Sequence, residues 1–193
     1  MTQKICWARR MFTEAQGQQL LAIARAAIAE TFDIHCAADR SAAWLQEPAA
    51  CFVTLTQHDE LRGCIGSLEP RRTLLEDIES NARAAAFSDP RFERLTREEL
   101  DRTDIEVSIL SPSQPIIFRD ENDALKQLRP GIDGVVFEYG HLRSTFLPQV
   151  WEQLPTPQEF MAHLKVKAGL PINFWGDAIK LSRYTVTKFC EHR

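Results

Sequence analysis

Several features that would assign a function class are missing from this 193-residue sequence. No stretch of about eighteen apolar residues exists to span a bilayer. The first ten residues lack the apolar run of a signal peptide, so we expect a cytoplasmic protein with no membrane partner. A phosphate-binding glycine loop, a Gly-x-Ser-x-Gly elbow and a His-Glu-x-x-His motif are also absent. Nothing in the sequence therefore proposes a metal or another cofactor, and we expect none.

Cysteine pairs at the spacing of a zinc site are missing too. The chain has five cysteines, an odd number, and no two of them are spaced as Cys-x-x-Cys. In a chain of this length, that pattern argues against a disulfide framework and against a structural zinc site. The five are Cys6, Cys36, Cys51, Cys64 and Cys190.

Clusters of positive charge are scarce. The formal net charge is −4, and the densest basic pairs are Arg9-Arg10 and Arg71-Arg72. A nucleic-acid footprint needs a dense cluster of Lys and Arg to displace counterions from phosphates. We therefore expect no nucleic-acid partner. The hydrophobic fraction of 44% is enough for a globular core.

Hydrophobic periodicity and turn residues divide the first half of the chain into elements. Thr13 and Gln16 have the spacing of a capping box, and Pro90 stops a later helix at the residues before it. Residues 51–56 alternate apolar and polar, which is typical of a half-buried strand. The expected elements are a helix over 13–33, a connection over 34–48, an antiparallel hairpin of 51–56 and 61–66, and a helix over 73–88.

The second half alternates strands and helices less regularly. Gly169 is expected to cap a helix that Pro171 prevents from continuing. The expected elements are a short helix at 96–100, strands at 105–109 and 116–118, a helix at 122–128, a hairpin of 135–138 and 142–146, a helix at 157–168, and a last strand at 178–190. This order predicts an α+β fold with a mixed, largely antiparallel sheet flanked by helices.

The segment from Leu61 to Leu68 carries the chemistry that the sequence proposes. On a strand, Arg62 and Cys64 fall on one face because side chains alternate with period two. Gly63 and Gly66 leave room for a ligand to come close. A guanidinium beside a thiol favours the nucleophilic thiolate. The hypothesis is a catalytic Cys64 with Arg62 as its activator or as the holder of an anionic substrate.

Three further polar residues are candidates for the same site. Asp89 and Arg91 form an Asp-Pro-Arg turn at a helix end, where they could line a substrate cleft. Glu106 lies on the polar face of an otherwise apolar strand, as a partner for Arg62 or a general base.

A structural interpretation stands beside each functional one. A free cysteine such as Cys64 is often a small buried side chain, and glycines can merely allow tight strand packing. Asp89 can bond to nearby backbone amides and pair with Arg91. A carboxylate in the position of Glu106 is most often at the wet face of a sheet.

Five ordered segments resemble the AMMECR family, also called AmmeMemoRadiSam system protein A. The similarity covers the chain from about Thr13 to Glu191. The segments are Leu61-Arg62-Gly63-Cys64-Ile65-Gly66, Ala86-Phe87-Ser88-Asp89-Pro90-Arg91-Phe92, Glu106-Val107-Ser108-Ile109-Leu110-Ser111-Pro112, Gly131-Ile132-Asp133-Gly134-Val135, and Leu147-Pro148-Gln149-Val150 with Lys167-Ala168-Gly169-Leu170-Pro171.

The resemblance implies a single domain over residues 1–193 that is made of two intimately packed lobes. It also implies partners, because bacterial and archaeal members are associated with Memo-like proteins and a radical-SAM enzyme. Members often carry a second cysteine before the Lys-Ala-Gly-Leu segment, where this chain has Lys165. Any thiol chemistry is therefore expected to run through Cys64 alone.

Two hypotheses about function follow, and the grouping of a thiol, a guanidinium and two glycines within five residues favours the first. In the first, the protein is a cysteine-centred enzyme that acts on a small substrate in a pathway with those partners. In the second, it is a non-catalytic module that binds a protein or a ligand, and Cys64 is a packing residue.

Overall fold

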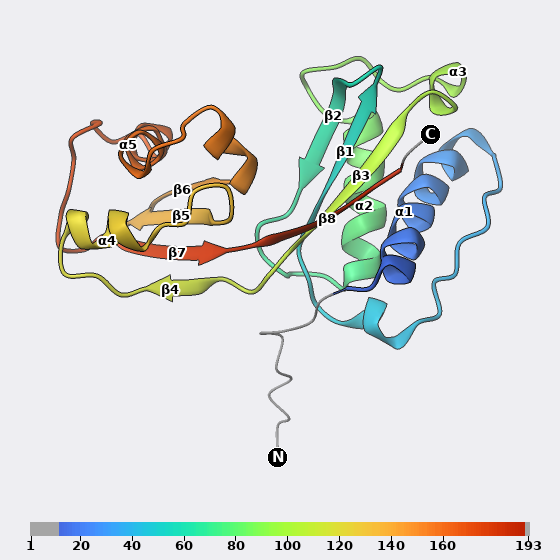
Figure 1. Cartoon of the computed structure of the whole chain (residues 1–193). Helices are drawn as coiled ribbons and strands as arrows, with labels where there is room; N and C mark the ends of the chain where they lie inside the picture. Colours follow the sequence, from blue (N-terminus) through green and yellow to red (C-terminus); the bar gives the residue numbers. More distant parts are fainter. Residues whose placement is uncertain (1–11, 192–193) are drawn as a thin grey trace. The chain divides into compact units, whose positions relative to one another are not determined.

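The structure is a computed structural model of the chain that describes residues 12–191. These residues divide into two compact units. We call residues 12–110 with 187–191 the larger unit, and residues 111–186 the smaller unit. Each unit has a four-stranded sheet and its own helices (Figure 1). The expected α+β class with antiparallel pairing is confirmed. Within the described range, no helix is both long and apolar enough to cross a lipid bilayer.

The sheet of the larger unit has the strand order β2-β1-β3-β8. The expected hairpin is confirmed, because β1 and β2 are consecutive antiparallel neighbours. Their turn contains His58 and Asp59, both with positive φ, which is the type I′ geometry that suits strand twist. The four strands are β1 (Cys51–Gln57), β2 (Glu60–Gly66), β3 (Asp104–Leu110) and β8 (Val186–Cys190).

Capping boxes fix where the helices of this unit begin. Thr13, Thr73 and Thr96 each cap a helix together with the glutamine or glutamate three residues later. The first helix is shorter than expected, because its last turn is a 3-10 helix that ends at Asp33 in a left-handed conformation. The expected connection over 34–48 also contains a 3-10 turn. The helical segments are α1 (Glu14–Ala29), α2 (Leu74–Phe87), α3 (Arg97–Leu100), Glu30–Phe32 and Ala43–Gln46.

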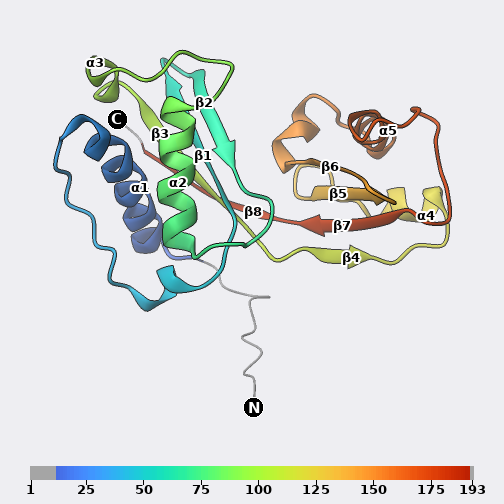
Figure 2. The same cartoon turned by 180° about the vertical axis from the view of Figure 1, so that it is seen from behind.

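One face of this sheet is covered by α1 and α2 (Figure 2). Cys51, Val53 and Leu55 alternate onto that face and are fully buried. The intervening Thr54 therefore points to the opposite face, and that face holds the candidate site.

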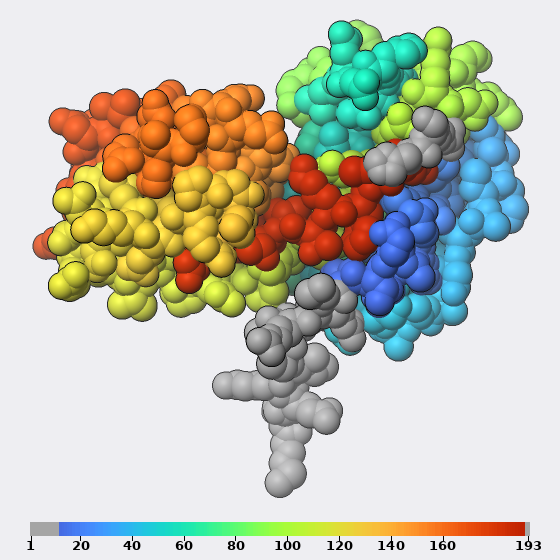
Figure 3. Space-filling view, viewed as in Figure 1, coloured from blue at the N-terminus to red at the C-terminus, as the bar shows by residue number. Residues whose placement is uncertain are grey.

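The C-terminal strand β8 packs against the N-terminal helix α1. A Cβ placed on Gly17 would lie 2.0 Å from the ring of Phe189, so only glycine lets the ring approach. Arg25 on α1 also pairs with Glu191. Figure 3 shows these red and blue segments, which come from opposite ends of the described chain, in contact.

The smaller unit has the strand order β4-β7-β5-β6. Aromatic rings lie within its largely aliphatic core: Trp151 and Phe160 are stacked with centroids 3.8 Å apart, and Phe137 is fully buried in the same cluster. The expected hairpin of β5 and β6 is confirmed. The elements are β4 (Gln114–Ile116), α4 (Glu121–Gln127), β5 (Gly134–Tyr139), β6 (Leu142–Phe146), a 3-10 turn (Pro148–Glu152), α5 (Pro157–Lys167) and β7 (Lys180–Tyr184).

Two expected strands differ from the structure. The last strand, expected to run unbroken over 178–190, is two strands in different sheets, with Thr185 between them. The backbone of Thr185 exchanges hydrogen bonds with Ser111, its N–H donating to Ser111 Oγ at 2.9 Å and its C=O accepting from the Ser111 N–H at 2.9 Å. The strand expected at 116–118 lies earlier, at Gln114–Ile116, where Pro115 is tolerated because β4 is an edge strand.

Candidate functional site

Strand β2, which carries the central cysteine motif, is irregular beside that cysteine. Leu55 of β1 faces Gly63, but the next residue, Thr56, faces Leu61. Arg62 is therefore the extra residue of a β-bulge, which bends a strand and redirects a side chain. The expectation that Arg62 and the thiol share a face assumed unbroken alternation, and the bulge removes that basis.

The guanidinium of Arg62 is bound by other residues of the larger unit. Its Nε and Nη2 donate to the two carboxylate oxygens of Glu99 at 3.3 and 3.1 Å. Its Nη1 donates to the backbone oxygen of Glu93 at 2.8 Å. The hydrogen bond from Arg62 is the largest cause that lowers the pKa of Glu99. Arg62 thus joins β2 to α3 and to the loop before it.

The Asp-Pro-Arg turn lies beside Cys64 and holds its backbone. Asp89 Oδ2 accepts the backbone N–H of Cys64 at 2.9 Å, and Arg91 Nη2 donates to the Cys64 carbonyl at 3.2 Å. Because β2 is an edge strand, these backbone groups lack a neighbouring strand on that side. The turn supplies one donor and one acceptor there, as a strand would.

Asp89 and Arg91 also form a close ion pair of 2.7 Å. The Asp89 side chain is only 2% exposed, and its pKa lies far below the usual value. The hydrogen bond from Arg91 is the main cause, the backbone N–H groups of Cys64 and Arg91 add to it, and burial opposes it. The pKa of Arg91 is raised, mainly by Asp89 and to a smaller extent by the Cys64 thiol. The guanidinium of Arg91 therefore lies close to that thiol.

Four side chains form a row across the sheet, which we call the polar row: Cys64, Thr54, Glu106 and Cys190. Thr54 of β1 faces Cys64 on one side and Glu106 on the other, so the three side chains share a face. The Thr54 hydroxyl donates to the Cys64 sulfur at 3.3 Å. With strands about 4.8 Å apart, the backbones of Cys64 and Glu106 are separated by about 10 Å.

Glu106 has partners at its end of the row. It accepts hydrogen bonds from Ser108 Oγ at 2.9 Å and Cys190 Sγ at 3.5 Å, and Lys188 Nζ lies 3.5 Å away. The pKa of Cys190 is raised by burial and then by the Glu106 charge. The two thiols of the row therefore differ: Cys190 sits beside a carboxylate, and Cys64 beside the guanidinium of Arg91.

The two motif glycines make room for the protein itself. A Cβ on Gly63 would lie 2.2 Å from the backbone oxygen of Ala85 on α2. A Cβ on Gly66 would lie 2.2 Å from the ring of Phe52. Close helix packing thus explains Gly63 without a substrate, and an aromatic contact explains Gly66.

A buried polar network beneath the motif was not anticipated from the sequence. Asp77 on α2 accepts hydrogen bonds from the Cys51 N–H at 2.9 Å and from Ser67 Oγ at 2.7 Å, and Arg72 binds the same carboxylate. Asn81 donates to the backbone oxygen of Cys51 at 3.0 Å. Burial strongly raises the pKa of the Cys51 thiol. A sequence indication existed, because Asp77 and Asn81 are four residues apart beside the apolar stripe of their helix.

The basic pairs, Cys6 and the possible metal ligands complete the comparison with the sequence. The pair Arg71-Arg72 is divided between Glu69 and Asp77 and forms no basic patch of its own. Cys6 and the pair Arg9-Arg10 lie outside the described residues. Over residues 12–191, no three His, Cys, Asp or Glu side chains come together as metal ligands.

The fold and the motif together define a class: an α+β chain with two antiparallel four-stranded sheets and an edge-strand cysteine held by an Asp-Pro-Arg turn. The model of the AMMECR1 family matches residues 21–189, and the chain belongs to that family.

Relatives and a solved structure agree with this assignment. Protein MJ0810 of Methanocaldococcus jannaschii is 40% identical over 153 residues, which cover 75% of this chain and 74% of that protein. A protein of Methanothermobacter thermautotrophicus is 38% identical over 146 residues, 72% of this chain and 74% of that protein. The crystal structure of PH0010 from Pyrococcus horikoshii has a TM-score of 0.82 at 31% identity, and the match covers 94% of each chain.

Proposed function

We propose that this AMMECR1-family protein is an enzyme in which the Cys64 thiol attacks or holds a small substrate. The observation that carries the proposal is the surroundings of the sulfur. A hydroxyl donates to it, and a guanidinium lies close to it. A hydrogen-bond donor and a cation beside the sulfur suit a site in which a thiol holds or attacks a substrate. The residue is half-buried rather than sealed in the core, as Cys51 is.

The backbone around Cys64 is held firmly, which suits a catalytic group. Asp89 and Arg91 fix its N–H and C=O, and neighbouring β1 fixes the other edge of the strand. A nucleophile on a strand with such support keeps its geometry better than one on a loop. Arg91 takes the activating role that the sequence assigned to Arg62.

Glu106 lies on the same face as Cys64, with Thr54 between them. The separation of about 10 Å between the backbones leaves room for a small substrate above Thr54. Glu106 would then serve as the general base or acid at the far side of that substrate. It does not act on the Cys64 thiol directly.

A second candidate function is a module that binds a partner or ligand without chemistry. The packing of Gly63 and Gly66 favours it, because protein atoms fill the space that a substrate was expected to use. Under this reading, the Asp-Pro-Arg turn serves only to cover the edge of the sheet.

The partners proposed from the family resemblance are a Memo-like protein and a radical-SAM enzyme. A cytoplasmic location is proposed as well, supported by the four described cysteines, all of which are free thiols.

Alkylation kinetics test the catalytic proposal. Iodoacetamide is added to the folded protein between pH 5 and pH 9, and mass spectrometry follows each cysteine separately. We expect Cys64 to react faster than free cysteine at pH 7. A Cys64 that is no more reactive than free cysteine would remove the nucleophile role. In that case, a Cys64→Ser variant that still captures a stoichiometric partner would support the binding module.

A further inference from the structure

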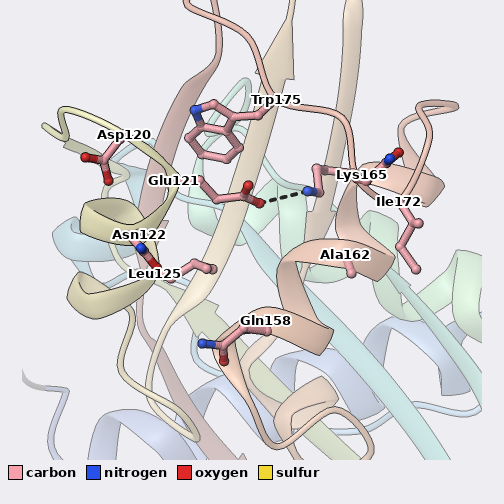
Figure 4. A pocket seen from close by; sticks show the side chains of 10 residues that line it. Asp120, Glu121, Asn122, Leu125, Gln158, Ala162, Lys165, Ile172 and Trp175 are labelled. Carbon is pink, nitrogen blue, oxygen red and sulfur yellow. Dashed lines mark hydrogen bonds and ion pairs between the residues drawn. The ribbon is translucent and has the colours of Figure 1, made fainter.

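The smaller unit contains a pocket formed by α4, α5 and the loop that follows α5 (Figure 4). Its volume is about 600 Å³, which is within the ordinary range for small-molecule sites. Three exposed side-chain amides line it. These amides belong to Asn122, Gln158 and Asn173.

An ion pair lies in the wall of this pocket. Lys165 Nζ donates to Glu121 Oε1 at 2.8 Å, and Figure 4 shows the two side chains pointing toward one another. The Lys165 side chain is 3% exposed and that of Glu121 is 36% exposed. The ammonium also lies 5.9 Å from the centroid of the Trp175 ring.

Both charged groups have unused hydrogen-bonding capacity. An ammonium has three donors, and a carboxylate accepts about four hydrogen bonds. Among residues 12–191, Lys165 uses one donor on Glu121, and its ammonium also lies over the ring of Trp175. A ligand oxygen can therefore accept from Lys165, and a ligand N–H can donate to Glu121, without breaking the pair.

Packing alone does not account for a lysine at this position. Burying an ammonium is costly unless its hydrogen bonds are satisfied. Only the ammonium of this pair is buried, since the Glu121 side chain is 36% exposed, and the pair satisfies one of the three ammonium donors. The residue is therefore better explained by a ligand that completes its hydrogen bonds.

The charges select the kind of ligand. Asp120 and Glu121 disfavour a phosphate or another multiply charged anion, and Lys165 disfavours a simple cation. A positive and a negative group side by side complement a molecule with the same two groups in the opposite order. Leu125, Ala162 and Ile172 supply an apolar wall next to the pair.

We propose that this pocket binds a free α-amino acid with an apolar side chain. Its carboxylate accepts from Lys165, its ammonium donates to Glu121, and its side chain packs against Leu125, Ile172 and the ring of Trp175. This site lies entirely in the smaller unit and does not depend on Cys64.

Titration calorimetry of the full chain with L-leucine tests the proposal. N-acetyl-L-leucine, which lacks the ammonium, and L-leucinamide, which lacks the carboxylate, are the matched probes. We expect L-leucine to bind and each blocked probe to bind at least tenfold more weakly. No binding of L-leucine at 10 mM, roughly the weak end of physiological ligand affinities, would overturn the proposal. Equal binding of either blocked probe would overturn it as well.

Variants locate the binding. Lys165→Met and Glu121→Gln should each weaken L-leucine binding at least tenfold. Lys167→Met should leave it unchanged, because Lys167 is on the same helix but donates to the Thr145 backbone oxygen outside the pocket. If Lys165→Met does not fold, the half-exposed Glu121 still provides the test. Unchanged binding in Glu121→Gln would overturn the site, and unchanged binding in Cys64→Ser would separate it from the proposed thiol chemistry.

Discussion

The carboxylate of Asp89 accepts the backbone N–H of Cys64 at 2.9 Å, although the two residues are 25 positions apart in the sequence. This hydrogen bond joins two of the five motifs by which the chain resembles its family. It shows what the Asp-Pro-Arg turn does in the fold: the turn completes the outer edge of the strand that carries the cysteine. The same turn places the guanidinium of Arg91 near the thiol.

Asp89→Asn should destabilise the protein at pH 7 by about 2–3 kcal/mol, because charge-assisted hydrogen bonds of a buried carboxylate are lost. The folded pKa of Asp89 is depressed, so its contribution is full above the usual value near 4 and is lost as the pH falls toward the folded pKa. The difference between wild type and variant should therefore narrow below about pH 4. Urea unfolding of both proteins at pH 7, 4 and 3 measures this difference in the free energy of unfolding.

Glu138→Gln is the matched control for that substitution. Glu138 pairs with Arg143 on the surface, and both side chains are about 40% exposed. An exposed pair of this kind contributes little, so the change should stay within about 0.5 kcal/mol. If Asp89→Asn lowers the free energy of unfolding at pH 7 no more than this control does, the Asp-Pro-Arg turn does not stabilise the edge strand.

Gly63→Ala should cost about 1–3 kcal/mol, the usual range for overpacking. The added methyl group would meet the Ala85 backbone oxygen at 2.2 Å, and a helix backbone cannot move aside as a side chain can. Gly176→Ala is the control, since its nearest contacts are an ordinary 3.5 Å. Thermal unfolding of both variants should show a lowered midpoint for Gly63→Ala only; equal midpoints would contradict the close approach of α2 and β2.

Glu106→Gln should increase the reactivity of Cys190. The Glu106 charge helps to raise the pKa of Cys190, so removing it lowers that pKa and increases the thiolate fraction at pH 8. Burial is the larger cause and remains, so we expect an acceleration of about two- to fivefold, the size of an exposed charge interaction. Alkylation followed by peptide mass spectrometry measures it. Cys51, which is buried, serves as an internal control and should stay unmodified until the protein unfolds. Slower alkylation of Cys190 in Glu106→Gln than in the wild type would contradict this prediction.

Local patterns in the sequence predicted much of the secondary structure. The capping boxes at Thr13 and Thr73, the hairpin of β1 and β2, and the alternation around Val53 depend on neighbours within a few residues. The break at Thr185 was missed, because it separates two sheets and no residue near it is a helix or strand breaker.

The candidate site was harder to predict, because its contacts are between strands. The bulge at Arg62 exists only relative to the register of β1. The polar row brings Cys64, Thr54, Glu106 and Cys190 together because the strand order is β2-β1-β3-β8. That order cannot be read from alternation within any one strand.

The central proposal is that Arg91, rather than Arg62, acts on the Cys64 thiol. The most direct measurement is the alkylation rate of Cys64 at pH 7 in Arg91→Gln and in Arg62→Gln. Each variant loses one ion pair of the larger unit, so the two are matched for that loss. We predict that Arg91→Gln slows the reaction about two- to fivefold, with a smaller effect in high salt, and that Arg62→Gln leaves the rate unchanged. A slower reaction in Arg62→Gln with an unchanged rate in Arg91→Gln would contradict the account.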